Sequence, residues 1–349
     1  MKTITWLLSL FTLLIQLLSC STDVPMLAEY KEIPVIYGLL DYKQDTNFVK
    51  ITKILTADNP ADVFAQYPDT VNFNKMLDVR LVEYVNGEFR REIVLDTITK
   101  KNKQSGIFPY PEQLLYYTMV RLLPNASGRH VSYELVVELD DQTIVSKTDL
   151  VGSGSFQIVS PHLNFSKMYF GTERTMLFLP AENAAFYDVD VSFVYKERRL
   201  PSEDTTTTVF HVISGRYTAD ELAYSMQGRD FCIRYRPEHF FMALREFLGD
   251  DTLNKNVWRY ITDYPLQVRI DAAGQGMLDY LYLQQLEMAT NVPNTDLSCV
   301  GRGAVGLFSS RCSITVPGRL AGWTVPDLLA MNWGFRFIGG KEEDLCENY

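Results

Sequence analysis

The five cysteines are the residues of this 349-residue chain whose spacing is most informative about chemistry. Cys20 stands apart, because it closes an apolar run from Trp6 to Leu18 that follows a short cationic start. Leu17 at position −3, the small Ser19 at −1 and the cysteine itself match the bacterial lipobox, in which the thiol receives a diacylglycerol. The run is too short to cross a bilayer as a helix. We therefore expect a signal peptide, cleavage before Cys20 and lipid attachment to its thiol.

The other four cysteines predict disulfides, because an even number in an exported protein is typical of paired thiols. Cys299 and Cys312 flank one glycine-rich segment, so we expect them to pair. Cys232 would then pair with Cys346 and tie the C-terminus to the domain body. Three connectivities fit four cysteines, and four free thiols are the alternative. No C-x-x-C pair or nearby histidine supports a zinc site, and we expect no metal.

A glycine motif at Gly301–Gly306 matches G-x-G-x-x-G. Binding a dinucleotide phosphate through this motif requires a strand before it and a helix opening at its end. Here a strand-like run, Leu307–Val316, follows instead. We interpret the motif as a glycine-rich β connection and expect no nucleotide cofactor.

The titratable residues form no catalytic pattern along the chain. Asp188 and Asp190 lie on one face of a predicted strand, where they could hold calcium or act as a carboxylate pair, although a solvated strand face is the simpler interpretation. There is neither an H-E-x-x-H nor a G-x-S-x-G motif. A serine triad of another spacing stays open, because triads are recognised by geometry. The histidines are His130, His162, His211 and His239.

The elements that position these residues are predicted to be mainly β-strands. Asn86-Gly87 separates two alternating segments, Leu77–Val85 and Phe89–Leu95, and predicts a type I′ hairpin. A second hairpin is expected over Val131–Thr148. Further strands are predicted at Val35–Leu40, Phe48–Leu55, Tyr116–Leu122, Asp188–Lys196, Thr205–Ile213, Leu266–Ile270, Leu278–Leu286, Leu307–Val316 and Phe335–Ile338. Helices are predicted at Pro237–Leu248 and Pro326–Trp333, and Pro111–Tyr117 could hold a helical turn.

These elements indicate two Ig-like or β-sandwich-type domains, with one or two short helices in the second. The flexible-looking Gly152–Ser155 sets the expected boundary. The division is residues 1–19 signal peptide, 20–31 tether, 32–155 N-terminal β-sandwich domain and 156–349 C-terminal β-rich domain.

Charge and aromatic content bound the function. The net charge is −10, and no block of five basic residues occurs, so nucleic-acid binding is not expected. The chain holds 20 Tyr and 20 Phe, most of which should fill the β core. Exposed rings could instead stack on sugars. The candidates for such a platform are Tyr116, Tyr117, Tyr280, Tyr282 and Trp323.

Four segments together resemble a known family: Val35–Leu40, Gly106–Pro109, Val145–Phe156 and Gly306–Arg311. In this order, behind a lipobox, they are similar to an uncharacterised β-rich lipoprotein family, a domain of unknown function, of the Bacteroidota cell envelope. The resemblance runs over most of the mature chain. It implies a two-part β fold and an envelope location, and it carries no catalytic residue.

Together these observations predict a non-enzymatic accessory or binding lipoprotein of the envelope. Ser21 is not the aspartate that retains some lipoproteins in the inner membrane, which favours the outer membrane. A partnership with an outer-membrane transporter is the favoured hypothesis, and a stand-alone glycan- or peptide-binding lipoprotein or a structural or adhesion component are the alternatives. Thr205 follows an aspartate in a loop predicted to be exposed, and is a candidate for the O-glycosylation that Bacteroidota place on exported proteins. Three other threonines share this setting: Thr70, Thr97 and Thr252.

Overall fold

The computed structural model describes residues 31–56, 71–104, 112–160, 174–235, 238–290, 300–320 and 324–337. The predicted signal peptide and Cys20 lie outside these residues. The described chain is mainly β, with several sheets and short helices, as the sequence predicted. None of its helices is both long and apolar enough to cross a membrane.

Ten strands form the largest sheet. They are β1 (Lys31–Leu40), β2 (Asn47–Thr56), β5 (Asp96–Lys100), β6 (Gln113–Thr118), β11 (Phe186–Arg199), β12 (Thr205–Thr218), β14 (Val257–Ile261), β15 (Leu266–Ala273), β16 (Val305–Gly318) and β17 (Phe335–Phe337). Their order is β17-β14-β11-β15-β16-β1-β2-β6-β5, and β12 also pairs with β11. Segments far apart in the sequence are therefore neighbours in one sheet.

Two smaller sheets complete the β structure. The first contains β3 (Asp78–Val85), β4 (Glu88–Val94), β7 (Val131–Glu138) and β8 (Thr143–Asp149), in the order β4-β3-β7-β8. The second contains β9 (Ile158–Ser160), β10 (Arg174–Phe178) and β13 (Phe231–Tyr235), in the order β13-β10-β9. At the β3–β4 turn, φ is 54° at Asn86 and 83° at Gly87, which confirms the predicted type I′ hairpin.

The described residues contain four α-helices, which is more than the one or two short helices expected. They are α4 (Ala219–Ala223), α5 (Glu238–Leu248), α6 (Gln275–Thr290) and α7 (Thr324–Ala330), and the 3₁₀ turn η1 (Gly249–Thr252) follows α5. Helices α5 and α7 confirm the two sequence predictions. The prediction of a strand at Leu278–Leu286 is wrong, because these residues lie in α6. The possible helical turn near residues 111–117 is also wrong, because its residues from Gln113 onward lie in the strand β6. Leu278 and Leu281, three residues apart, pack with Phe186 and Ala273, and this contact with the sheet selects the helical period.

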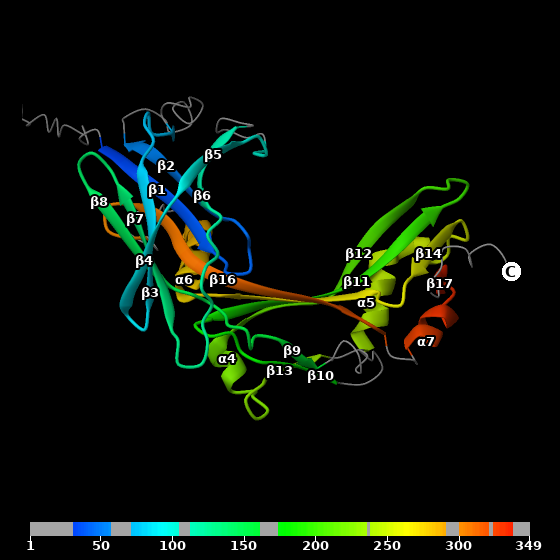
Figure 1. Ribbon diagram of the computed structural model, residues 1–349. Coiled ribbons are helices and arrows are strands. Elements are labelled where there is room, and N and C mark those ends of the chain that lie inside the picture. The colour runs from blue at the N-terminus through cyan, green and yellow to red at the C-terminus, as the bar shows by residue number, and fades with distance from the viewer. Residues whose placement is uncertain are drawn as a thin grey trace, which may run out of the picture.

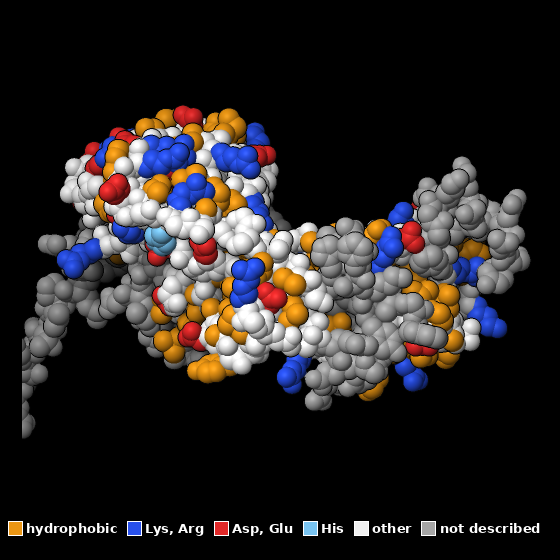
Figure 2. All heavy atoms as spheres, turned by 60° about the horizontal axis from the view of Figure 1, so that its bottom comes forward, with side chains coloured by type: hydrophobic (Ala, Val, Ile, Leu, Met, Phe, Trp, Pro, Cys, Tyr) orange, Lys and Arg blue, Asp and Glu red, His pale blue; other side chains and the backbone are white. Residues whose placement is uncertain are grey.

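Figure 1 shows two lobes joined by long strands. The larger lobe holds β1 to β8, α6 and one end of β16, and the smaller lobe holds α5, α7, β14, β17 and the far ends of β11 and β12. Strands β11 and β16 each have 14 residues, enough to extend about 45 Å at the usual rise. The narrowing between the lobes is also visible in Figure 2.

The largest sheet crosses the boundary that the sequence predicted near residue 155. Val35 in β1 lies opposite Val305 in β16, and the two strands run parallel. Residues after 155 therefore build part of the larger lobe as well as the smaller one. The segment expected to be flexible is also packed, because Gly152 and Ser153 are buried and the Gly152 amide donates to the Glu182 carbonyl oxygen at 2.9 Å.

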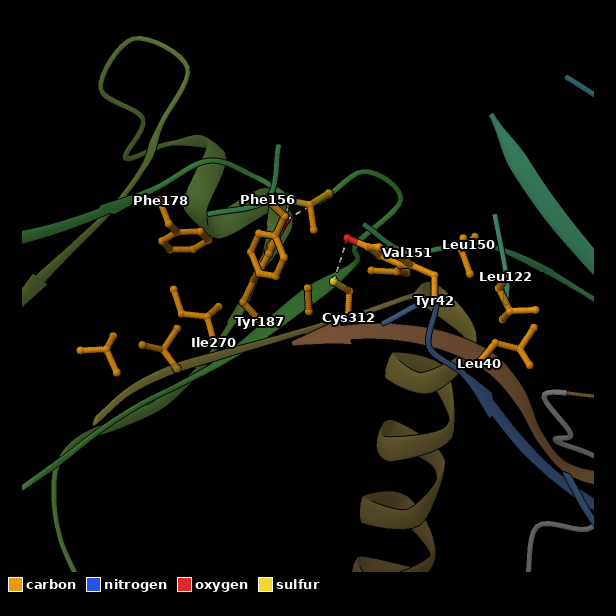
Figure 3. Packing of buried hydrophobic residues seen from close by; sticks show 14 of the residues in the cluster. Leu40, Tyr42, Leu122, Leu150, Val151, Phe156, Phe178, Tyr187, Ile270 and Cys312 are labelled. Atoms are coloured by element: carbon orange, nitrogen blue, oxygen red, sulfur yellow. Dashed lines mark hydrogen bonds between the residues drawn. The ribbon is translucent and has the colours of Figure 1, made fainter. Parts of the chain in front are cut away.

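One hydrophobic core runs through both lobes. At the middle, the Tyr187 ring packs edge-on against Phe178 and Phe231, with ring centres 5.3 and 5.5 Å apart. Figure 3 shows this cluster continuing past Cys312 and Tyr42 into the larger lobe. Aromatic pairs in this geometry add to the stability gained from burial alone, so the joint between the lobes is a packed core.

Candidate functional site

A groove of about 680 Å³ lies between β8 and the start of α6. Residues 147–149 of β8 form one wall, and Gly274 with the first part of α6, as far as Leu283, contributes the other. Phe308 of β16 and Asn183 complete the lining. The volume falls in the range of small-molecule sites.

The start of α6 lies directly on the backbone of β16. The Gly274 amide donates to the Ser310 carbonyl oxygen at 3.0 Å, and a Cβ at Gly276 would lie 3.4 Å from the Phe308 carbonyl oxygen. The small glycines allow this close approach. Beneath them, the buried Ser309 hydroxyl has no hydrogen-bond partner among the described residues.

The polar groups around the groove are mixed in sign. His130 Nε2 lies 3.0 Å from Asp149 Oδ1, and the Asp149 backbone carbonyl accepts a hydrogen bond from the Ser310 hydroxyl at 2.6 Å. On the helix, Gln275 Nε2 donates to Asp279 Oδ1 at 2.7 Å. Lys147 adds one cation. Carboxylate, amide and ammonium groups therefore line the space together, a set suited to a ligand that both donates and accepts hydrogen bonds.

The predicted aromatic platform forms only in part. Tyr282 is 54% exposed and lines the groove, as such a platform requires. Tyr280 and Tyr117 are half-buried. Tyr116 is only 2% exposed, and its hydroxyl accepts a hydrogen bond from the Leu77 amide in the interior. Trp323 lies outside the described residues. The expectation is therefore corrected for Tyr116, which is a core residue.

The aspartates of β11 contact basic side chains of β12. Arg216 donates to both carboxylate oxygens of Asp188, each at 2.7 Å. Asp190 contacts both Ser192 and His211 Nδ1. Ser192 also approaches Nδ1, at 3.3 Å, so serine and aspartate share one ring nitrogen. A hydrolytic triad needs them on opposite nitrogens, so this cluster is an ion-pair network on a strand pair.

No metal cluster is present in the part of the chain that the structure describes, where no group of three His, Cys, Asp or Glu side chains converges. His130 and His211 each contact a single aspartate. His162 and the side chain of His239 lie outside the described residues.

The glycine motif at 301–306 is a β connection, as predicted. A Cβ at Gly301 or Gly306 would collide with the backbone of Val145 or Ile36, respectively. Strand β16 starts at Val305, so no helix follows the motif. These glycines let β16 enter between neighbouring strands, and they form no phosphate cradle.

The disulfide pairing stays a prediction, because the expected partners Cys299 and Cys346 lie outside the described residues. The other two cysteines, Cys232 and Cys312, are buried and have free thiols in the structure. The Cys312 thiol lies beside the Tyr42 hydroxyl, with sulfur and oxygen 3.7 Å apart. A buried cysteine of this kind packs as a small apolar residue.

Thr205 is exposed at the first position of β12, as expected for a modification site. Its glycosylation stays a prediction. Thr97 and Thr252 are half-buried, and Thr70 lies outside the described residues.

No family model matches this chain, and a search of curated proteins found no matching relative. The resemblance to envelope lipoproteins therefore stays an expectation. The groove was missed in the sequence because Lys147, Asn183 and Asp279 are far apart along the chain and α6 was assigned as a strand. The one local signal for the groove was the pair of glycines at 274 and 276, one residue apart, before a run of helix-compatible residues.

Proposed function

We propose that this protein is a lipid-anchored binding protein of the bacterial outer membrane and that its groove binds a glycan. The observation that carries the proposal is the groove beside α6. It combines the exposed Tyr282 ring with amide and carboxylate groups from Asn183, Gln275 and Asp279. Sugars present an apolar C–H face that stacks on such rings and hydroxyls that pair with planar polar groups.

A non-catalytic role is supported by the chemistry of this groove. The imidazole next to the groove, that of His130, pairs with the Asp149 carboxylate. Among the described side chains, no hydroxyl or thiol nucleophile contacts the His130 ring or that carboxylate. Covalent catalysis needs a nucleophile within hydrogen-bond reach of its base. The groups present can hold and orient a ligand.

The lipid anchor is supported by the lipobox and by the short chain that precedes the first strand. Ten residues lie between Cys20 and Lys31, the first residue of β1. That length spans at most about 40 Å when fully extended. The larger lobe, with its groove, would then stay close to the membrane surface.

The test is binding of short neutral oligosaccharides to the full-length Cys20→Ser protein, measured by calorimetry. Tyr282→Ala should weaken binding tenfold or more, because it removes the stacking ring. Tyr224→Ala is the matched control, since Tyr224 is 93% exposed and outside the groove. Failure of every sugar to bind, or equal losses in the two variants, would contradict the proposal.

Partnership with an outer-membrane transporter is the second candidate function. It is supported by the exposed apolar side chains on the distal half of α6, where Leu286 is 47% and Met288 is 73% exposed. Exposed apolar groups gathered on one element mark interaction surfaces. The native lipoprotein should then co-purify with a near-stoichiometric transporter from gently solubilised membranes, and Met288→Asp should reduce the yield of that partner. Recovery of the lipoprotein alone would exclude this role.

A further inference from the structure

A second hollow, lined by none of the groove residues, lies in the larger lobe. It encloses about 300 Å³ and is lined by Arg90, Arg91, Arg121, Tyr42 and residues 122–124. We name it the arginine hollow. Two of its arginines are adjacent in β4, which in a regular strand would point them to opposite faces.

A β-bulge aims both arginines at one carboxylate. In the β3–β4 pair, Glu83 lies opposite Arg91 and Tyr84 lies opposite Phe89, so Arg90 is the extra residue. Arg90 Nη1 and Arg91 Nη2 each bond one oxygen of Glu83, the latter at 2.8 Å. Bulges of this kind re-aim side chains and are frequent beside functional sites.

Glu83 is the buried anchor of this network. Its side chain is 0% exposed, and the Tyr133 hydroxyl donates to Oε2 at 2.6 Å. Burial by itself opposes ionisation of Glu83, but hydrogen bonds from Arg91, Tyr133 and Arg90 outweigh it and lower the pKa. Glu83 is therefore charged at neutral pH and holds both guanidinium groups in place.

Positive charge remains in excess after this pairing. Three arginines line the hollow and two of them pair with the single carboxylate of Glu83, which leaves a formal charge of +2. Arg91 Nη2 also donates to the Arg121 carbonyl oxygen at 3.0 Å, which ties the Arg121 backbone to this network. The guanidinium of Arg121 forms no ion pair with any described residue, and Arg91 Nε has no acceptor among them. Figure 2 shows basic side chains gathered on the surface of this lobe.

We propose that the arginine hollow binds a dianionic oxyanion, the phosphate or sulfate group of a ligand. A dianion balances the excess charge, and guanidinium groups bind such groups through paired N–H donors. The flat Tyr42 ring and the apolar residues 122–124 would contact the part of the ligand that carries the group.

Position in the lobe favours a soluble phosphorylated or sulfated ligand over a headgroup of the anchoring membrane. Tyr42 lies two residues beyond the end of β1, whereas the tether enters at the first residue of that strand, Lys31. A strand of 10 residues separates these ends by about 33 Å. The hollow thus lies at the end of the lobe away from the point of attachment.

The test is titration of the full-length Cys20→Ser protein with inorganic phosphate, with sodium chloride at matched ionic strength as the reference. Phosphate should bind with saturation and raise the unfolding temperature beyond the effect of chloride. Arg121→Gln should weaken binding at least tenfold without loss of folding, because Arg121 is exposed and supports no described ion pair. Arg229→Gln, which removes the same charge at an exposed turn, should leave binding unchanged.

Absence of saturable phosphate binding would overturn the proposal, and so would equal losses in Arg121→Gln and Arg229→Gln. Sedimentation with phosphatidylglycerol vesicles separates the two sources of the anion. If the protein binds the vesicles and Arg121→Gln abolishes that binding, the ligand of the site is a lipid headgroup, and the proposal of a soluble ligand is overturned. Phosphate binding without vesicle binding supports a soluble ligand. Neutral sugar binding in Arg121→Gln should be unchanged, which keeps this test independent of the groove.

Discussion

Gly152 and Cys312 pack so closely that a Cβ atom at position 152 would lie 2.8 Å from both Cβ and Sγ of Cys312. The φ of Gly152 is +91°, which side chains rarely adopt. The contact joins the segment after β8 to the strand that connects the two lobes. The cysteine expected to form a disulfide and the glycine expected to form a linker are therefore packed against each other at the joint.

Gly152→Ala should destabilise the protein much more than Gly87→Ala. Gly87 also has a positive φ, of 83°, but a Cβ there meets nothing within 4 Å. Backbone strain alone should cost Gly87→Ala about 1 kcal/mol. The clash with Cys312 should raise the cost of Gly152→Ala to about 3 kcal/mol. Urea unfolding of the two variants measures both values. Equal costs would show that the contact between Gly152 and Cys312 can relax without loss of stability.

The thiols of Cys232 and Cys312 should react only after unfolding, with no reductant added. Both are buried, and burial raises the pKa of the Cys312 thiol, which lowers the fraction of reactive thiolate. Ellman's reagent applied to the Cys20→Ser protein before and after denaturation tests this, with peptide mapping to locate the label. If these two cysteines are labelled only after a reductant is added, the result would support the disulfide prediction.

Glu83→Gln should destabilise the larger lobe by about 1–3 kcal/mol at neutral pH, because it leaves two arginines facing each other without a carboxylate. The folded-state pKa of Glu83 lies below its ordinary value of 4.5. Its stabilisation is therefore complete above that value and is lost as pH falls through the folded-state pKa. The difference in unfolding free energy between wild type and variant should be constant near neutral pH and shrink as pH falls below 4.5. The exposed Glu92 gives the control, Glu92→Gln, and a difference that grows on acidification would refute the assignment.

Cys20→Ser should move the protein from the membrane fraction to the soluble fraction. The substitution removes the thiol that receives the lipid, and with it the acyl chains that make anchoring stable. Fractionation followed by immunoblotting provides the measurement. A variant that is still cleaved and still sediments with membranes would show that another part of the chain holds it there.

The strands and hairpins were predictable because their signals are local. Asn86-Gly87 between two alternating segments was enough to specify the turn, since both residues accept the positive φ that a type I′ turn requires. The same holds for α5, whose apolar residues recur at helical spacing. The lipid attachment at Cys20 rests on a local signal too, a motif of four residues, and it stays a prediction because these residues lie outside those the structure describes.

What only the tertiary structure decided depends on contacts between distant residues. Because β16 lies between β1 and β15, strands from both predicted domains form one sheet. The residue pattern within β16 does not indicate which strands it pairs with. The helical state of α6 is set by packing of Leu278 on Phe186, which outweighs a strand-like composition. The arginine hollow depends on a one-residue bulge opposite Glu83. A strand's own side chains do not specify such a register, because register is settled by pairing and burial across the sheet.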